Sequence, residues 1–319
     1  MVTSRRSRSA ATQSDRRPRE KRHETESVDL AWVALQCLLC GSAKHRPVFN
    51  EDGIDILQCR DCRHVFSSFA ADPHYDGFWG EEVAQGEQRY WNNARRRMYQ
   101  DFARRFLAGG SGRLLDMGCG LGFFLKAISP YRNWEVHGCE ISPAAVRYAR
   151  ETLGLRSVMR TALEDADLPR NSFDIVTLWD VLEHVPRPDP LLARCHSLLR
   201  EGGLCFLRTP NIALHLPRAR LLRLVLGMRP NVSYLQARNH LHHYSQASIR
   251  RLLERNGFSR VEFLHLRPVR NAGLRGGVKH VWFQGVRALS RVTKGRVNLD
   301  TLFVLARKPN ALGDDRHKT

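Results

Sequence analysis

Short apolar runs alternate with amphipathic stretches through the middle of the chain. Strand-length apolar runs lie at 113–117, 134–139, 156–160, 173–179 and 204–209. Segments with helical spacing or helix start and stop signals lie at 89–107, 123–128, 142–153, 190–199 and 245–256. Two final runs, 261–266 and 302–307, bring the predicted strands to seven. This alternation predicts an α/β domain built on a doubly wound, largely parallel sheet.

Four cysteines at the front of the chain form two Cys-x-x-Cys pairs, Cys37 with Cys40 and Cys59 with Cys62. The 18 residues between the pairs fall within the spacing typical of structural zinc sites. Four thiolates would complete a closed tetrahedral shell, so we expect a structural rather than a catalytic metal. The pattern predicts a small zinc ribbon over residues 29–70, with strands at 45–50, 54–58 and 63–68. Two disulfides or a coincidental spacing are the alternatives.

Basic charge is in excess, at 51 Lys and Arg against 32 Asp and Glu, a formal net charge of +19. Residues 1–28 are basic with few apolar side chains, and we expect a disordered arm there and a disordered tail at 311–319. Hydrophobic residues make up 42% of the chain, which excludes wholesale disorder. No apolar run suits a membrane span or a signal peptide, so the protein is expected to be soluble and cytoplasmic. The arm is expected to be solvated, or to contact nucleic acid or an anionic membrane.

A glycine-rich turn follows the run at 113–117 and precedes a helical segment. Its glycines are Gly118, Gly120 and Gly122, and Asp116 lies just ahead of them. The strand, glycine turn and helix are typical of a nucleotide-binding corner. A dinucleotide site would carry another glycine where Phe123 stands, and a pyrophosphate would be repelled by the adjacent carboxylate. The corner therefore favours a ligand that is cationic near Asp116.

Other acidic residues end or follow the neighbouring predicted strands. Glu140 ends the second strand, where a carboxylate can accept hydrogen bonds from both hydroxyls of a ribose. Glu164 and Asp165 follow the third strand, and the fourth ends at Trp179. We expect Asp174, at the start of the fourth strand, to bond to backbone rather than to ligand.

These motifs, with Leu182-Glu183-His184-Val185 after the fourth strand, resemble the class I S-adenosylmethionine-dependent methyltransferases over about residues 90–310. The similar subgroup is the ubiquinone-biosynthesis O-methyltransferases, including a bacterial branch that carries a zinc ribbon. The resemblance implies a Rossmann-like methyltransferase domain, which we place at residues 71–310. It also implies that Asp116 and the three glycines hold the methionyl and ribose end of the cofactor, and that Glu140 takes the ribose hydroxyls. Glu164 or Asp165 would flank the adenine, and Trp179 would line the cleft.

Histidines near the predicted cleft are the candidates for a general base, which methylation at oxygen usually needs. They are His184, His240 and His243, the last two in the sequence His-Leu-His-His-Tyr. Two signals of nucleic-acid base methylation, Asn-Pro-Pro-aromatic and Pro-Cys, are absent after the fourth strand. The sequence thus favours a small-molecule acceptor over nucleic acid.

Two basic amphipathic stretches, 213–228 and 278–292, lie in the second half of the chain. Each can lie on an anionic membrane surface, or can pack on its own domain with a charged outer face. We therefore expect O-methylation of an apolar, lipid-linked or sugar-containing metabolite, with peripheral contact at the inner membrane surface. The alternatives are an RNA methyltransferase that binds through the ribbon and arm, and a non-catalytic zinc-ribbon adaptor.

Overall fold

The computed structural model describes residues 35–69, 95–162, 165, 167–227, 234–266, 281, 284–289, 292–293 and 301–310. The described residues all belong to one compact unit, Leu35–Thr319. The predicted arm, the tail and parts of the stretch at 278–292 lie outside the described residues. Among the residues that are described, none of the helices has the length and apolar character needed to cross a bilayer.

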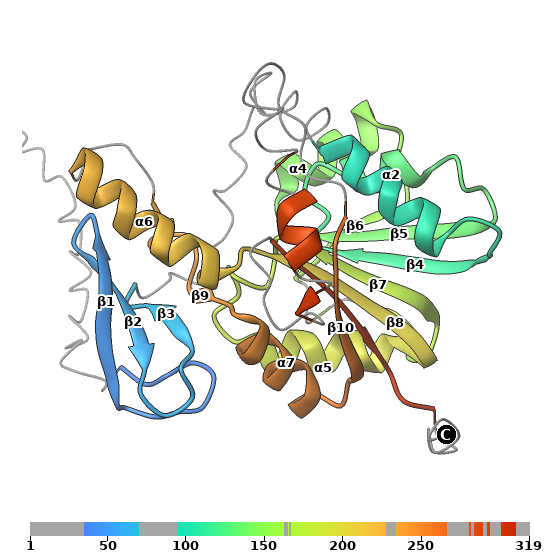
Figure 1. The fold of residues 1–319 in the computed structure, drawn as a ribbon. Helices are drawn as coiled ribbons and strands as arrows, with labels where there is room; N and C mark the ends of the chain where they lie inside the picture. Colours follow the sequence, from blue (N-terminus) through green and yellow to red (C-terminus); the bar gives the residue numbers. More distant parts are fainter. Residues whose placement is uncertain are drawn as a thin grey trace, which may run out of the picture. The chain divides into compact units, whose positions relative to one another are not determined.

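A sheet of seven strands forms the centre of this unit (Figure 1). The strands are β4 (Gly112–Met117), β5 (Trp134–Glu140), β6 (Val158–Arg160), β7 (Phe173–Trp179), β8 (Leu199–Thr209), β10 (Ser259–Leu264) and β11 (Leu302–Arg307). Their order across the sheet is β10-β11-β8-β7-β4-β5-β6. All neighbours are parallel except β11, which is antiparallel to both β8 and β10. The predicted α/β doubly wound fold is confirmed.

Helices cover both faces of this sheet (Figure 1). One face packs against α2 (Arg95–Phe106), α3 (Phe123–Ile128) and α4 (Pro143–Arg147). The other face packs against α5 (Pro188–Leu198) and α7 (Gln246–Arg255). Strand residues alternate between the two cores, as the pleat requires: Leu114 belongs to the first and Leu115 to the second.

The front of the chain forms a small antiparallel sheet with a strand from the second half. Its strands are β1 (His45–Glu51), β2 (Ile54–Cys59), β3 (Val65–Ser67) and β9 (His242–His243), in that order. A further helix, α6 (Ile212–Leu226), buries Ala219 against residues of this sheet, including Phe49 and Ile56. The three ribbon strands lie close to their predicted positions, whereas β9 was not foreseen.

Two elements differ from the sequence expectation. The helix predicted to reach 153 ends as α4 at Arg147 and continues as a π-helical turn, η3 (Tyr148–Thr152). Strand β8 starts at Leu199 instead of at the predicted 204. It therefore includes Gly202 and Gly203, which lie in an irregular part of the strand. There the register against β7 shifts between Phe173 and Ile175. Gly202 and Gly203 therefore permit a bulge in this strand.

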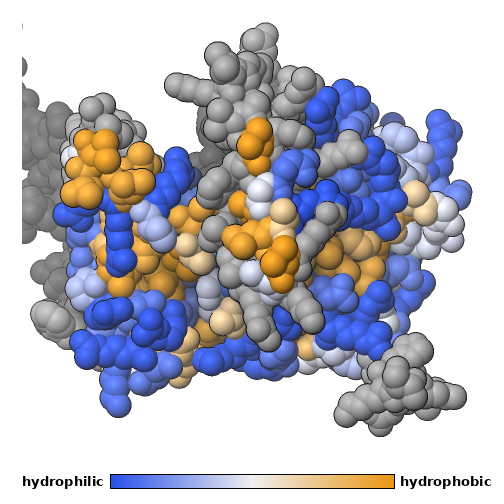
Figure 2. Space-filling model, in the orientation of Figure 1, coloured by the Kyte–Doolittle hydropathy of each residue, from blue (hydrophilic) through white to orange (hydrophobic). Residues whose placement is uncertain are grey.

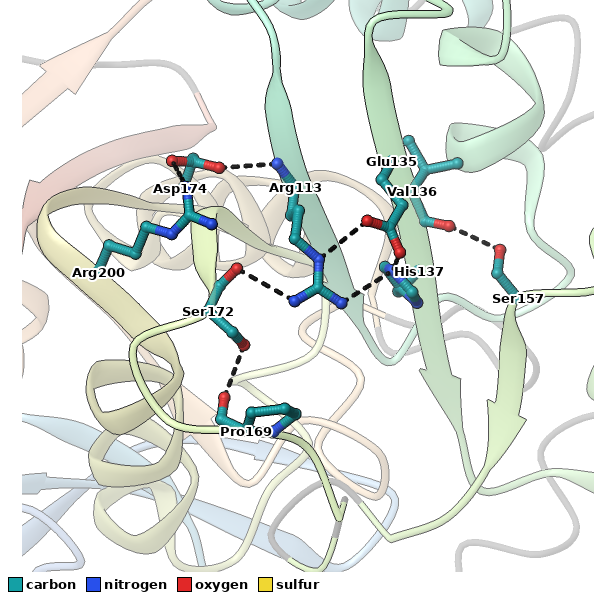
Figure 3. A network of polar contacts seen from close by, with 9 residues as sticks. All are labelled: Arg113, Glu135, Val136, His137, Ser157, Pro169, Ser172, Asp174 and Arg200. Atoms are coloured by element: carbon teal, nitrogen blue, oxygen red, sulfur yellow. Dashed lines mark hydrogen bonds and ion pairs between the residues drawn. The ribbon is translucent and has the colours of Figure 1, made fainter.

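A polar network ties together the amino-terminal ends of the central strands (Figure 3). One Asp174 oxygen accepts the Arg113 backbone N–H at 2.7 Å, and the other pairs with Arg200 at 2.9 Å. The Arg113 guanidinium also pairs with Glu135 at 3.0 Å. Asp174 thus bonds to backbone, as expected. The carboxyl-terminal ends of the same strands are where the candidate ligand groups gather.

Candidate functional site

The winding of the sheet reverses between β4 and β7. From β4 the chain proceeds outward through β5 and β6 on one side, and β7 and β8 lie on the other. Ligands of open α/β sheets bind at the carboxyl ends of the strands beside such a reversal. The glycine turn follows β4 there, and Asp180 follows β7. The fold therefore places the glycine turn and the loop after the fourth predicted strand at the same edge.

Asp116 lies in β4 with 1% of its surface exposed. Its Oδ1 accepts a 2.6 Å hydrogen bond from the Thr177 hydroxyl of β7. Burial, together with the nearby Glu140, raises the pKa of Asp116 to about 8, against the lowering effect of the Thr177 hydrogen bond. A buried carboxyl with this pKa gains most from a ligand that brings positive charge.

Glu140 ends β5, and its carboxylate faces the glycine turn. The Gly120 backbone N–H donates to one oxygen at 2.8 Å, and the Ser142 N–H donates to the other at 2.9 Å. Burial raises the pKa of Glu140 despite these hydrogen bonds. An ionised carboxylate offers about four lone-pair sites, and two are used here. The remainder can accept two hydroxyls, so the group fits the predicted ribose contact.

The glycine turn has left-handed backbone at each predicted glycine. The φ angles are 71° at Gly118, 53° at Gly120 and 81° at Gly122. A Cβ on Gly118 would lie 2.7 Å from a methyl of Val181, in the loop after β7. Glycine is thus required both by the backbone conformation and by the close approach of that loop. The turn brings two strand-end loops into contact at the ligand edge.

The remaining predicted cofactor residues are Glu164, Asp165 and Trp179. Glu164 lies outside the described residues, and Asp165 is exposed, with its backbone N–H bonded to the Ala162 carbonyl. Trp179 is 7% exposed and packs against Tyr99 and Phe102 in an aromatic cluster. Contacts of these residues with a cofactor remain predictions.

Two of the three predicted catalytic histidines lie side by side. The ring centroids of His184 and His240 are 4.8 Å apart, and His243 is 6.2 Å from His240. His184 Nδ1 donates to the Asn239 carbonyl at 2.8 Å, which leaves Nε2 as its acceptor nitrogen. Burial lowers the pKa of all three, to about 2 for His240 and about 3 for His243. They are neutral at pH 7, which suits hydrogen-bond acceptors or metal ligands more than strong bases.

Glu183, next to His184, completes a cluster that the sequence did not reveal. The residue is 1% exposed, and neither carboxylate oxygen makes a hydrogen bond of ordinary geometry among the described residues, although Thr209 lies near enough to lower its pKa. Burial raises its pKa to about 7. Single ligand atoms of Glu183, His184 and His240 lie within 4.8 Å of one another. One carboxylate and two neutral imidazoles form a donor set that can hold a divalent cation.

A buried ion triad stands beside this cluster. Asp180, at φ 55°, pairs with Arg95 of α2 through one oxygen and with Arg208 of β8 through the other. Both guanidinium groups and the carboxylate are at most 13% exposed. The charge of Arg208 contributes to the low pKa of His240. Asp180 directly follows the fourth predicted strand, and the sequence gave no sign of its two partners, which lie 85 and 28 residues away.

The four ribbon cysteines converge as predicted. Their sulfur atoms lie within 4.8 Å of one another, with Cys37 to Cys62 at 3.5 Å and Cys40 to Cys59 at 3.6 Å. Tetrahedral zinc with four thiolates has sulfur–sulfur edges of roughly 3.8 Å, from Zn–S bonds of about 2.3 Å. The cysteines are free, with no disulfide between them. The cluster fits one zinc ion, so the disulfide alternative is not favoured.

Comparison with known proteins identifies the family. A family model described as a methyltransferase domain matches residues 90–262, more than half of the chain. The chain belongs to this methyltransferase family. A ubiquinone biosynthesis O-methyltransferase of Alkalilimnicola ehrlichii is 35% identical over 119 residues, 35% of this chain and 47% of that protein. One from Xanthomonas oryzae pv. oryzae is 37% identical over 115 residues, 34% of this chain and 46% of that protein.

This methyltransferase spans about half the length of the curated relatives it matches. Among solved structures, a SAM-dependent methyltransferase from Archaeoglobus fulgidus is 19% identical, covering 70% of this chain and 99% of that one, with a TM-score of 0.46. The matched residues 90–262 contain the glycine turn and the histidine cluster, and exclude the four ribbon cysteines. The ribbon therefore needs an account of its own in this methyltransferase.

Proposed function

We propose that the protein transfers a methyl group from S-adenosylmethionine to an oxygen of a small molecule. The observation that carries the proposal is the pair of buried carboxyls, Asp116 and Glu140, around a left-handed glycine turn at the reversal of the sheet. The bound cofactor would supply an electrophilic methyl group on a sulfonium cation. Negative charge at this corner suits the cationic methionyl end, and the Glu140 oxygens suit the ribose hydroxyls.

The acceptor side of the proposed site is formed by Glu183, His184 and His240. A hydroxyl acceptor must be oriented and must lose its proton. The neutral imidazoles can accept its hydrogen bond, or can hold a divalent cation together with Glu183. A cation would lower the pKa of a bound hydroxyl. Where no cation is bound, Glu183, with a pKa of about 7, is matched to receive the proton at neutral pH. His243 lies farther from this group, against the ribbon strand β3.

Isothermal titration calorimetry with S-adenosylmethionine tests the cofactor assignment. Asp116→Ala and Glu140→Ala should each weaken binding by at least roughly ten-fold, since each removes a charged or charge-assisted contact. Glu262→Gln, at an exposed position of β10, is the matched control and should bind as the wild type does. Unchanged affinity in both alanine variants would sink the site assignment. No uptake by the wild type would favour the non-catalytic adaptor.

The proposed acceptor is apolar, lipid-linked or sugar-containing, and is reached at a membrane surface. Helix α6 supports this part, because it exposes Leu221, Leu224 and Val225 at 59%, 83% and 68%. Figure 2 shows hydrophobic residues gathered over α6. Three arginines, Arg218, Arg220 and Arg223, are exposed on the same helix, which carries no acidic residue. An apolar surface flanked by arginines suits anionic lipid.

A further inference from the structure

The segment 234–243 lies between the ribbon and the proposed acceptor site. Toward the site, the backbone N–H groups of Leu241 and His242 donate to the Glu183 carbonyl at 2.8 and 3.1 Å. Asn239, in the same segment, accepts the hydrogen bond that orients His184. The side chain of His240 contributes to the cluster itself. The position of this segment therefore decides whether the three groups of the cluster meet.

On its other side, the segment is held by the carboxylate of Glu51, the last residue of β1. This side chain is 3% exposed. It accepts hydrogen bonds from the backbone N–H groups of Tyr234 at 2.6 Å, Leu235 at 3.0 Å and Ala237 at 3.1 Å. One buried carboxylate thus satisfies three amides of a segment more than 180 residues away in the sequence. Hydrogen bonds to an ionised acceptor in a buried place are among the stronger ones.

Strand β3 of the ribbon adds a second attachment. The Ser67 hydroxyl donates to the Ala237 carbonyl at 2.6 Å, and the Ser67 backbone N–H donates to the Leu241 carbonyl at 2.9 Å. In addition to these bonds of Ser67, β3 pairs with β9 in an antiparallel ladder. His64, which precedes β3, bonds through Nε2 to His242 Nδ1 at 3.0 Å. Contacts from β1, from β3 and from the residue before it all converge on one segment.

The cysteine cluster sets the position of these ribbon strands. Cys59 ends β2, and its backbone N–H donates to the carbonyl of His64 at 2.9 Å. Cys37 and Cys59 are buried in the same hydrophobic core as Tyr244, which follows β9 directly. The Arg255 guanidinium at the end of α7 bonds to the Leu39 carbonyl, between Cys37 and Cys40. A path of direct contacts therefore runs from the four thiols to the segment that bears His240.

We propose that the ribbon positions the acceptor wall, which is the segment 234–243 together with Glu183 and His184. Glu51 is the positioning residue that holds 234–243 against the other two. The role in acceptor placement rests on the proposed function, whereas the clamp itself does not. Metal bound by the four cysteines supports the clamp. Loss of that metal or of the Glu51 carboxylate frees the acceptor wall. The cofactor corner stays formed, because none of the hydrogen bonds of Asp116, Glu140 and the glycine turn among the described residues reaches the ribbon.

Hydrogen–deuterium exchange of the full-length, zinc-loaded protein tests the clamp directly. In Glu51→Gln, peptides covering 234–243 should exchange at least roughly ten-fold faster, and peptides covering 112–122 should be unchanged. Ser67→Ala should give a weaker effect in the same peptide. Glu51→Asp, which keeps the charge on a shorter side chain, should recover part of the protection. Asp52→Asn is the matched control, because Asp52 is the exposed neighbour of Glu51 and its φ of 51° suits asparagine.

A second arm removes the metal. Titrating the wild type with an organomercurial thiol reagent, with zinc release followed by a chromogenic chelator, should produce the same faster exchange at 234–243 as Glu51→Gln. Calorimetry should give an affinity for S-adenosylmethionine within about two-fold of the untreated protein. Unchanged protection at 234–243 in Glu51→Gln, or equal loss at 112–122, would overturn the clamp. Protection that survives zinc release would overturn the role of the metal. Absence of cofactor binding in the untreated protein would overturn the proposed function alone.

Discussion

Asp116 is a carboxyl group whose surroundings oppose its own ionisation. Burial and the neighbouring Glu140 hold its pKa at about 8, so without ligand it carries a proton at neutral pH. A cationic ligand reverses the balance and favours the carboxylate. Binding of S-adenosylmethionine should therefore release a proton from this residue. The affinity should rise with pH below about 8 and level off above it, where the free protein has already lost that proton.

Calorimetry between about pH 6 and 6.8 measures this linkage below the titration of the ligand's α-amino group, whose ordinary pKa is about 7.7–8.0. The expected slope approaches about ten-fold per pH unit, and the binding heat should depend on the ionisation enthalpy of the buffer. Asp116→Asn should bind more weakly and with a flatter pH dependence, and Glu140→Gln should keep most of the slope. An equal slope in wild type and Asp116→Asn would show that the proton comes from another group.

Gly122 and Gly154 allow two reasons for requiring glycine to be measured separately, namely the backbone conformation and the lack of space for a side chain. Both have left-handed backbone, at φ 81° and 73°. A Cβ on Gly122 would lie 2.6 Å from Leu155 Cδ1, whereas nothing lies within 4 Å of a Cβ on Gly154. Gly154→Ala should cost about 1–2 kcal/mol from conformation alone. Gly122→Ala should cost roughly 2–5 kcal/mol, since overpacking adds to the strain. Chemical denaturation compares the two, and equal costs would contradict the packing argument.

At the residue scale, the sequence identified the site residues whose positions follow from the order of the strands. It missed the residues whose environment depends on contacts with distant parts of the chain. Asp116, Glu140 and the three glycines follow strand ends, so alternation alone puts them at one edge. Glu183 lies within a motif, but its unpartnered burial depends on a loop more than 50 residues later in the sequence. The clamp by Glu51 was likewise invisible, because a glutamate at the end of a strand, just before a turn, carries no local signal of three backbone donors.

Helices α6 and α7 are both basic and leucine-rich, yet their environments differ. In α7, Ile249, Leu252 and Leu253 are completely buried, and Ser245 with Ser248 forms a capping box at its start. In α6, Leu224 is 83% exposed. The sequence predicted both helices, and their different burial follows from which other elements cover them. Apolar periodicity gives the face of a helix but not its partner.

A pair of leucine substitutions measures that difference. Leu252→Ala should destabilise the protein by about 2–5 kcal/mol, since it leaves a cavity between α7 and the sheet. Leu224→Ala should change stability by less than about 0.5 kcal/mol. Urea denaturation monitored by circular dichroism gives both values under the same conditions. A large loss in Leu224→Ala would show that another part of the chain covers α6, and would weaken the argument for a membrane-facing helix.

Across the whole molecule, the sequence correctly predicted the sheet, its winding and the three ribbon strands. It described the ribbon and the methyltransferase domain as successive segments, divided at residue 70. The structure instead completes the ribbon sheet with β9 and joins the buried ribbon residues to the core around α7. The pairing of Phe66 with His242 spans 176 residues, and a two-residue strand is too short to show a hydrophobic pattern from which it could be predicted. Long-range pairings of short strands are set by tertiary packing, which local patterns do not record.

The excess of basic charge leads to a prediction about the molecule as a whole. The proposed cofactor corner is acidic, whereas α6 exposes three arginines beside its apolar side chains. The protein should float with vesicles containing anionic phosphatidylglycerol and should remain behind with neutral phosphatidylcholine. High salt should reduce the recovery, because each arginine near a charged surface contributes about 1 kcal/mol and salt screens it.

Substitution of Leu224 and Val225 together by Asp should abolish flotation, because two charges then replace the apolar surface that would enter the lipid interface. The matched control is Leu38→Asp, which places the same side chain at an exposed apolar position of the ribbon, 41% accessible. It should float as the wild type does. Equal recovery with neutral and anionic vesicles, or loss of flotation in both variants, would separate membrane binding from α6. The acceptor would then have to reach Glu183 and His240 from solution, which would favour a soluble metabolite over a lipid-linked one.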